Sequence, residues 1–357
     1  MRKPTPTHRL ASLKNHLNYR WCQKLSTKAT ITHRGAALLG KNVACDAFDE
    51  SKPIRVVTHA HADHMIGLQQ SLRTCEKVLM TKLTKDLIDV MRSPLFLMGG
   101  FVETLDYGKT LQYEEECITF FHADHILGAA QVLVEDVEGT RIVYTGDFRV
   151  DGTPVLDADF LVMEATYGSP TCKRSFEEDV KELLVSIVEE GLKHGTVYVF
   201  GYHGKLQEVM QILHETGIKA PFVAPERVFH VSRVCEQHGM RLGRLILSEE
   251  REARELLEKN SPCIAFYHMG SRSKVGRYGF RVYVSGWEFD SPCREIADKE
   301  YVIALSDHSD FDGLMEYVRR SKPKFVITDN FRIGHAETLA REIHKRFGIS
   351  ALALPKR

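Results

Sequence analysis

Short runs of apolar residues alternate with polar and glycine-containing turns along the first half of the chain. Runs of this length, rich in β-branched residues and bounded by turn residues, predict buried β-strands. The pattern therefore indicates a β-rich first part. The strands that we expect span residues 43–45, 54–57, 118–121, 131–134, 141–144 and 160–163.

The pattern changes at about residue 175, where apolar residues begin to recur at helical spacing. Ser175 followed three residues later by Glu178 predicts a capping box that opens an amphipathic helix. A strand at 197–200, a glycine-containing turn and a second helix ending near Gly217 follow. Strand–loop–helix repeats of this kind indicate α/β layers. Beyond 300 we expect strands at 301–305 and 324–328 and helices at 312–320 and 336–347.

The composition is that of an ordinary globular protein. The chain has 357 residues, 43% hydrophobic and 27% charged, which suits two domains or one large one. No apolar run approaches the length of a membrane span, and the basic N-terminus lacks the apolar core of a signal peptide. We therefore expect an intracellular protein, cytoplasmic or associated with the nucleoid or nucleus, without a membrane partner. Eight scattered cysteines without a Cys-x-x-Cys pair suggest free thiols.

The net charge is zero but unevenly distributed. Residues 1–45 contain nine Lys or Arg and no Asp or Glu, which leaves 39 basic and 48 acidic residues in the rest. Such a basic arm fits a polyanion partner, and equally a solubilising tail. A second basic cluster interleaves with aromatic residues, as phosphate contact with base stacking requires. It comprises Arg272, Lys274, Arg277 and Arg281 with Tyr278 and Phe280.

A dense group of metal-binding residue types follows the predicted strand 54–57, in the sequence His59-Ala-His61-Ala-Asp63-His64. Alternate side chains of an extended chain share a face, so His59 and His61 can bind one metal. Asp63 and His64 can point to a second metal as the chain turns. Imidazoles with a carboxylate suit Zn²⁺, and less strongly Mn²⁺ or Fe²⁺. The alternative interpretation is a histidine-rich surface loop.

Further polar residues stand at the ends of other predicted strands, where a site above a sheet edge would need them. They are Asp46, His125, Asp147 and His308. A separate zinc site is a weaker alternative, built from His230, Cys235, His238, Cys263 or His268. The turn Gly201-x-x-Gly204-Lys205 before a helix is a candidate phosphate cradle.

These residues, in this order, resemble the metallo-β-lactamase fold. The long α/β segment before His308 resembles the β-CASP nuclease branch of that fold. Val-Ala-Cys-Asp46-Ala-Phe is similar to a motif of Artemis-like DNA repair nucleases, and Asp-His125-Ile-Leu-Gly-Ala-Ala to one of RNA-processing members. Glu164-Ala-Thr-Tyr-Gly fits the first β-CASP motif. Gly-Trp287-Glu-Phe and Leu-Ser306-Asp-His308-Ser-Asp resemble DNA-acting and ligase-associated exonucleases.

The resemblance implies an αββα sandwich with an inserted α/β β-CASP domain. The metallo-β-lactamase domain would comprise residues 1–170 and 300–357, with a basic segment at 1–30, and the β-CASP domain residues 171–299. It implies two Zn²⁺ ions, with Mn²⁺ as a possible substitute. The implied metal ligands are His59, His61, Asp63, His64, His125, Asp147 and His308.

The resemblance also implies roles around the metals. Asp46 would orient a ligand histidine through its free ring nitrogen. The catalytic residues would be Asp63, Asp147, Glu164 and His308, with Glu164 positioning a histidine or assisting proton transfer. The candidate phosphate and nucleic-acid contacts are Gly204, Lys205, Ser306, Arg272, Lys274 and Arg277.

One motif departs from the family pattern. RNA-acting and ligase-associated members place a histidine after the strand that corresponds to 325–328, whereas Asp329-Asn330 stands there in this chain and His335 follows later. We expect a zinc-dependent nuclease, an exonuclease on single-stranded DNA with a role in repair and directed by a 5′-phosphate. An RNA exonuclease or endonuclease is the nearest alternative. A small-molecule hydrolase and an inactive scaffold subunit are the others.

Overall fold

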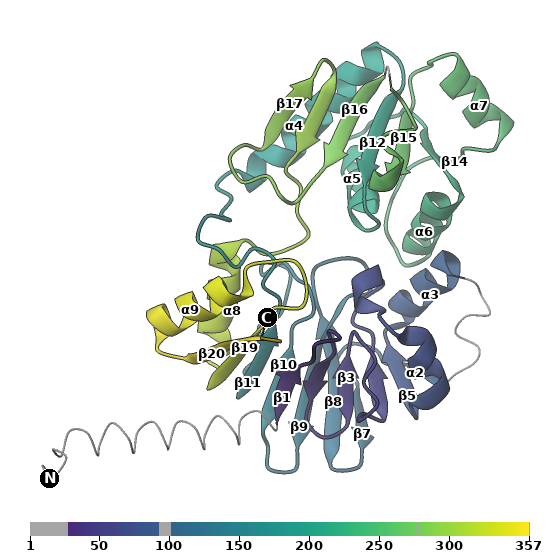
Figure 1. Cartoon of the computed structure of the whole chain (residues 1–357). Helices are drawn as coiled ribbons and strands as arrows, with labels where there is room; N and C mark the ends of the chain where they lie inside the picture. The colour runs from purple at the N-terminus through teal and green to yellow at the C-terminus, as the bar shows by residue number, and fades with distance from the viewer. Residues whose placement is uncertain (1–27, 93–100, 278, 357) are drawn as a thin grey trace, which may run out of the picture.

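Three β-sheets carry the architecture of the chain. The computed structural model describes residues 28–92, 101–277 and 279–356. Two sheets lie face to face in the lower half of Figure 1, and the third forms the centre of the upper half. The chain mixes helices and strands throughout, which confirms the α/β class that the apolar pattern predicted.

The first sheet has six strands that lie side by side in their order along the chain. Its first three strands are antiparallel to one another, and the last four run parallel. Strands β3 and β4 are buried along their whole length, including the charged Arg55 of β4. The strands are β1 (Ala29–Ile31), β2 (Ala37–Leu39), β3 (Val43–Cys45), β4 (Ile54–Val56), β5 (Lys77–Met80) and β6 (Val102–Thr104).

The second sheet has seven strands in the order β20-β19-β11-β10-β9-β8-β7. Strands β7 to β10 form an antiparallel meander, and β10, β11, β19 and β20 run parallel. The parallel half therefore joins segments that are far apart in sequence. The strands are β7 (Thr110–Tyr113), β8 (Glu116–His122), β9 (Ala130–Asp136), β10 (Arg141–Tyr144), β11 (Phe160–Met163), β19 (Phe325–Asp329) and β20 (Ser350–Leu354).

The two sheets pack through one apolar core, which includes Leu39 and Val56 from the first sheet and Phe120 and Ile142 from the second. Helices cover the outer faces. Removing each large apolar side chain from water contributes roughly 1.5–3 kcal/mol, so these faces hold the layers together. The first sheet is covered by α2 (Leu68–Thr74) and α3 (Lys82–Met91), and the second by α8 (Phe311–Ser321) and α9 (Ala336–Phe347).

The third sheet also has seven strands, in the order β14-β13-β15-β12-β16-β18-β17, and only β17 is antiparallel to its neighbour. Its strands are β12 (Val197–Gly201), β13 (Phe222–Ala224), β14 (Leu245–Leu247), β15 (Ile264–His268), β16 (Phe280–Val284), β17 (Cys293–Ala297) and β18 (Glu300–Ile303). Its helices are α4 (Glu177–Lys193), α5 (Lys205–Glu215), α6 (Glu226–Gln237) and α7 (Arg251–Glu258).

Two details differ from the sequence-based expectations. Strand β18 pairs with β16, so the third sheet extends past the boundary expected at residue 299. The capping box expected at Ser175 is wrong, because α4 begins at Glu177 with Phe176 as its N-cap and no side-chain cap. Ser175 lies one residue too early to bond the first helical amides.

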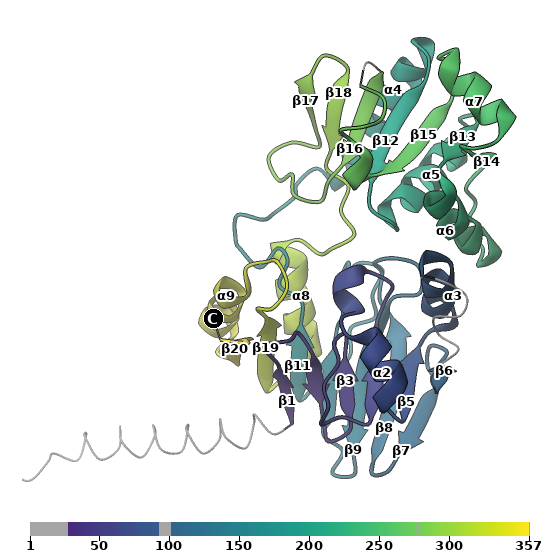
Figure 2. The ribbon, with the colours of Figure 1, turned by 45° about the vertical axis from the view of Figure 1, so that its right-hand side comes forward.

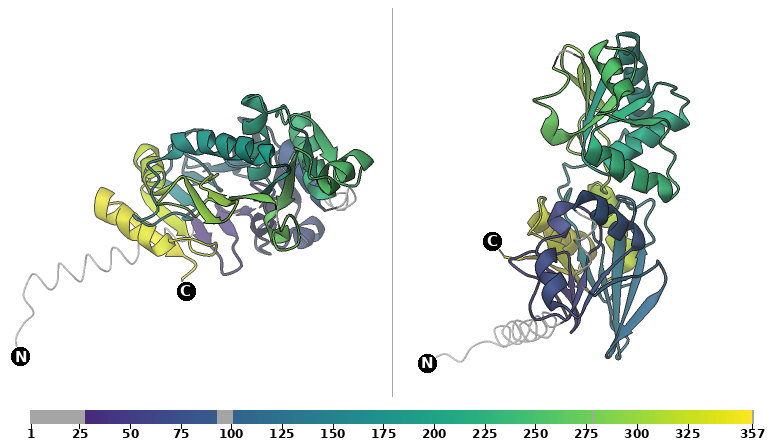
Figure 3. Two further views of the ribbon diagram at one scale, coloured as in Figure 1. Left: turned by 90° about the horizontal axis from the view of Figure 1, so that it is seen from above. Right: turned by 90° about the vertical axis from the view of Figure 1, so that its right-hand side faces the viewer.

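Apolar contacts and an ion pair join the upper and lower parts of the chain. Helix α3 lies against α6 at this boundary, and Leu87 of α3 belongs to the same apolar cluster as Val231 of α6 (Figure 1). Arg149 of the lower part forms a 2.7 Å ion pair with Glu208 of α5. The right panel of Figure 3 shows the two parts stacked end to end. None of the described helices combines the length and hydrophobicity that crossing a bilayer requires.

Candidate metal centre

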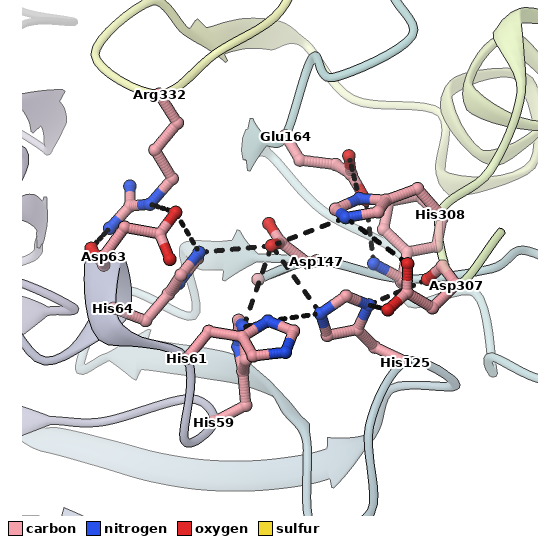
Figure 4. Close-up of polar contacts among 12 residues, drawn as sticks. His59, His61, Asp63, His64, His125, Asp147, Glu164, Asp307, His308 and Arg332 are labelled. Atoms are coloured by element: carbon pink, nitrogen blue, oxygen red, sulfur yellow. Dashed lines mark hydrogen bonds and ion pairs between the residues drawn. The ribbon is translucent and has the colours of Figure 1, made fainter. Parts of the chain in front are cut away.

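The predicted ligands gather where several strands end, at the boundary between the two parts (Figure 4). His59 and His61 follow β4, and the short 3₁₀ turn η1 (Ala62–His64) then redirects the chain. This turn places Asp63 and His64 beside the ends of the second sheet. His125 follows β8, Asp147 follows β10 and His308 follows β18. Strand ends from all three sheets thus supply one cluster.

The first group of side chains converges on His61. Its Nδ1 lies 3.1 Å from His59 Nε2 and 3.1 Å from His125 Nε2. Asp147 Oδ2 lies 3.7 Å from His59 Nε2 and 3.8 Å from His125 Nε2. All of these ligand atoms lie within 4.8 Å of one another, so one cation can contact the whole group.

A second group lies on the other side of Asp147. His64 Nε2 is 3.1 Å from Asp147 Oδ2 and 3.7 Å from Asp63 Oδ2, and His308 Nε2 is 4.0 Å from Asp147 Oδ2. The same Asp147 oxygen therefore faces both groups. The position suits a carboxylate shared between two cations.

Every histidine of the centre has its outward ring nitrogen bonded to a protein group. This arrangement fixes the orientation of the ring and directs the other nitrogen toward the centre, as at protein metal sites. The outward contacts are His59 Nδ1 with Thr58 Oγ1 at 3.0 Å, His61 Nε2 with the His203 carbonyl at 3.2 Å, His64 Nδ1 with Asp46 Oδ2 at 2.7 Å, His125 Nδ1 with the Asp307 carbonyl at 2.8 Å, and His308 Nδ1 with Glu164 Oε2 at 2.9 Å.

Asp46 and Glu164 each hold further groups in place. Asp46 is fully buried and accepts hydrogen bonds from the Thr58 amide at 2.8 Å and the Thr58 hydroxyl at 2.7 Å. Glu164 also accepts from the Phe148 amide at 2.8 Å. Both carboxylates therefore lie behind a histidine and not in front of it. Glu164 Oε2 thus contacts the Nδ1 side of the His308 ring.

The electrostatics of the centre favour a bound cation. Burial lowers the pKa of His59 and His61, and lowers that of His125 to about 3, so these rings offer lone pairs at neutral pH. Burial also disfavours protonation of His64, but the Asp147 and Asp46 carboxylates outweigh it and raise its pKa to about 10. His64 Nε2 is buried and lies 3.1 Å from Asp147 Oδ2. A buried nitrogen in such a negative field fits a metal ligand.

Asp307 is a member of the site that the sequence analysis missed. Its carboxylate is buried and lies 2.6 Å from Lys205 Nζ, while its carbonyl bonds His125. The sequence signal was its place directly before His308. The Gly204 amide donates to Gln207 Oε1 at 2.8 Å. In this structure, therefore, protein groups already engage both Lys205 and Gly204, the two residues expected to cradle a phosphate.

Of the other residues expected to contact nucleic acid, Ser306 lies in the site and the basic residues near 272–281 lie outside it. Ser306 lies in the site, where its hydroxyl accepts from the His308 amide at 3.1 Å. Arg281 pairs with Glu300 at 3.1 Å, and Phe280 is buried, so the expected base stacking by Phe280 is wrong. Tyr278 and residues 1–27 lie outside the described residues. Arg272, Lys274 and Arg277 are exposed and do not line the cleft above the centre.

The alternative zinc site is wrong, because its residues are dispersed. His238 pairs with Asp86 at 2.8 Å, and Cys263 contacts Thr196 at 3.4 Å. Within the described ranges, the clusters able to hold a metal contain none of its five candidates, which are His230, Cys235, His238, Cys263 and His268.

Arg332, a second residue missed by the sequence analysis, reaches the centre from the loop after β19. Its guanidinium forms a 2.6 Å ion pair with Asp329 and donates to the Asp63 carbonyl at 3.1 Å. His335 is exposed at the start of α9. Arg332 therefore faces Asp63, whereas His335 lies on the surface. The sequence signal was its spacing of three residues from Asp329.

A cleft of about 820 Å³ opens above the centre. Its floor includes His61, Asp63 and His308, and its far wall comes from the ends of strands in the third sheet. The centre is therefore reachable from solvent through a space lined by both parts of the chain.

No protein-family model matches the chain. An uncharacterized protein from the lig 3′ region of Acidianus ambivalens is 40% identical over 138 residues, 38% of this chain and 99% of that protein. A probable DNA ligase of Opitutus terrae is 26% identical over 84% of this chain and 28% of its own length. The endoribonuclease YSH1 of Eremothecium gossypii is 30% identical over 48% of this chain and 27% of its own length.

An RNase J-like protein and transcription termination factors named FttA also match. The chain spans between 27% and 60% of the length of these named relatives. Among solved structures, a protein of unknown function from Enterococcus faecalis aligns with a TM-score of 0.57 and 15% identity, over 87% of this chain and 81% of that chain, and this likeness shows a shared fold alone. These relatives confirm the resemblance of the chain to the metallo-β-lactamase-fold β-CASP family.

Proposed function

We propose that this chain is a two-metal nuclease that hydrolyses phosphodiester bonds in single-stranded nucleic acid. The paired ligand groups on either side of Asp147 Oδ2 carry this proposal. The face-to-face sheets with outer helices would be the αββα sandwich, comprising residues 28–170 and 304–356. Residues 171–303, with the third sheet, would be the β-CASP insertion.

The donor set favours zinc, with manganese as an alternative, because neutral imidazoles outnumber carboxylates. One ion would be held by His59, His61 and His125, the other by Asp63, His64 and His308, and Asp147 would be shared. Two such ions supply Lewis-acid activation of water and stabilise negative charge on a phosphodiester.

The remaining residues would keep this arrangement rigid. Asp46 and Glu164 would hold the rings of His64 and His308, and the proton on each Nδ1 would remain in that hydrogen bond. Asp307 and Lys205 would neutralise each other behind His125. Preorganised groups of this kind require little reorganisation during the reaction.

DNA is the favoured substrate. The names of two relatives, a probable DNA ligase and a protein from a lig 3′ region, support a role beside DNA joining, hence in repair. The resemblance of the Gly-Trp287-Glu-Phe and Leu-Ser306-Asp-His308-Ser-Asp motifs to those of DNA-acting and ligase-associated exonucleases also favours exonuclease action, which we propose is directed by a 5′-phosphate. RNA is the second candidate, supported by the relative named as an endoribonuclease and by the RNase J-like protein.

The test uses end-labelled single-stranded DNA and RNA of matched sequence, each with a 5′-phosphate or a 5′-hydroxyl, and enzyme loaded with Zn²⁺ or Mn²⁺. Cleavage of DNA from the phosphorylated end is the expected result. Cleavage of RNA alone would overturn the DNA preference. Metal-loaded protein that cleaves neither polymer would overturn the proposed activity. The matched control is Asp312→Asn, an exposed carboxylate paired with Lys173.

A further inference from the structure

The far wall of the cleft is formed by one edge of the third sheet. Strands β12, β15, β16 and β18 run parallel, so their carboxyl ends meet at this edge. The end of β15 brings His268 into the cleft, and the segments that follow β12, β16 and β18 bring Tyr202, Trp287 and His308. In sheets of this kind, ligands bind in the crevice outside the carboxyl ends of the strands.

Two aromatic side chains in this wall are exposed to an unusual degree for their size. Tyr202 is 53% exposed and Trp287 is 48% exposed, and both line the cleft together with His61 and Asp63. Large aromatic side chains are normally well buried, because each removes a large apolar area from water. Their exposure beside the metal centre therefore indicates a surface that a ligand covers.

Although Trp287 is half exposed, its ring packs against the buried Tyr167 on one side. Its ring meets the edge of Tyr167 at 5.1 Å between centroids, and Tyr167 in turn lies 5.7 Å from the ring of His308. Arg174 stacks on Tyr167 at 4.5 Å and on Phe289 at 4.6 Å, and also donates to the Gly286 carbonyl. The indole thus lies only two ring contacts from a predicted metal ligand.

The charge of the cleft suits a polyanion. Arg92 and Arg227 line it and are exposed. Among the described lining residues, the carboxylates are Asp63 and Asp307, which face Arg332 at 3.9 Å and Lys205 at 2.6 Å respectively. The outer part of the cleft therefore combines aromatic surfaces with cations. Protein channels for single-stranded nucleic acid have the same combination.

We propose that Trp287 and Tyr202 form a base-stacking subsite for unpaired nucleotides next to the scissile phosphate, with Arg227 contacting the backbone. This inference rests on the proposed nuclease function and specifies its substrate as an unpaired strand. In a duplex the bases already stack on one another, so their faces are not available to Trp287. Every base can stack on an aromatic ring, so the subsite would distinguish unpaired from paired strands and would not distinguish one sequence from another.

The main test combines protein variants with modified substrates. Trp287→Ala and Tyr202→Ala are each assayed on a single-stranded oligonucleotide and on one that is abasic near the scissile phosphate. Each variant is expected to weaken binding and raise KM for the intact strand roughly 5-fold to 150-fold. On the abasic strand the variants should match wild type, since the stacking partner is already absent. Trp287→Phe should retain most of the affinity.

Two controls keep folding separate from binding. Phe101→Ala removes an aromatic side chain that is 78% exposed and does not line the cleft, so its KM should stay at the wild-type value. Thermal unfolding of each variant reports whether the fold is retained. Equal KM values for Trp287→Ala and wild type on the intact strand would overturn the subsite, even if cleavage is normal.

A binding measurement separates the subsite from catalysis. Quenching of 2-aminopurine placed near the scissile phosphate reports stacking without cleavage, and should be lost in Trp287→Ala. Quenching by wild type without any cleavage would support the subsite and contradict the nuclease proposal. Cleavage without quenching would support the nuclease and contradict the subsite. Neither quenching nor cleavage would overturn both.

Discussion

The metal centre and the cleft above it adjoin each other, yet their side chains are held in opposite ways. In the centre, every ring of the predicted histidine ligands has its outward nitrogen bonded, and His59 and His64 are fully buried. In the cleft, Tyr202 and Trp287 keep about half of their surface exposed. The comparison indicates that the centre is built for fixed geometry, whereas the aromatic side chains of the cleft are left open to a ligand.

The largest expected effect comes from the atom shared by both ligand groups. Asp147→Ala removes the oxygen that lies within 4.0 Å of four ring nitrogens, so cleavage should fall at least about 1,000-fold. Single-turnover rates and the metal content per protein measure the loss. Asp312→Asn should keep the wild-type rate. A variant with normal rate and metal content would contradict the assignment of the centre.

A smaller effect is expected from Asp46, which contacts the ligand histidine His64 on the side away from the metal centre. Asp46→Asn keeps the shape of a side chain at a positive φ of 64°, a conformation that Asn tolerates, but weakens its bond to His64. Loss of such an outer partner typically costs 10-fold to 100-fold in metal affinity. Competition with a chelator measures the zinc affinity. An affinity equal to wild type would mean that Asp46 does not orient His64.

Substitution of Arg332 tests whether this residue supports the metal centre or only the stability of the fold. Arg332→Gln should reduce cleavage about 10-fold because Asp63 loses its guanidinium contact. It should also destabilise the fold, because the buried Asp329 carboxylate loses its ion-pair partner and keeps, among the described residues, only the hydrogen bonds from the Phe331 and Arg332 amides. Adding Asp329→Asn should restore stability, measured by urea unfolding, but not the cleavage rate. Recovery of both would assign Arg332 a purely structural role. His335→Ala is the matched control and should cleave normally.

The smallest effect is expected from the basic residues outside the cleft. Replacing Arg272, Lys274 and Arg277 together by Ala removes exposed charges that do not line the cleft. Affinity for single strands should fall less than about 3-fold at physiological salt, through long-range attraction alone. Titrations at two salt concentrations measure it. If the affinity fell as much as in Trp287→Ala, the single strand would bind along this basic segment and not only in the cleft.

Much of the centre could be predicted because its signals are local. His59 to His64 form one turn after a buried strand, and the strand-end positions of His125, Asp147 and His308 could be inferred from apolar runs alone. The α/β class followed from the change from short apolar runs to helical spacing near residue 175. In contrast, the capping box at Ser175 was wrong, because helix ends depend on a single residue of register.

What the sequence by itself determined was therefore the class of the fold and the identity of the residues that converge on Asp147. Only the tertiary structure decided which neighbours those residues have. Arg332 meets Asp63, and Lys205 meets Asp307, across separations of more than one hundred residues that no local pattern encodes. The sequence did not reveal exposure either. Phe280 and Trp287 each follow a glycine and precede a charged residue, but Phe280 is buried in β16, whereas Trp287 is exposed in the segment after it. Burial depends on what the rest of the chain packs against a residue, and that is settled only when the sheets assemble.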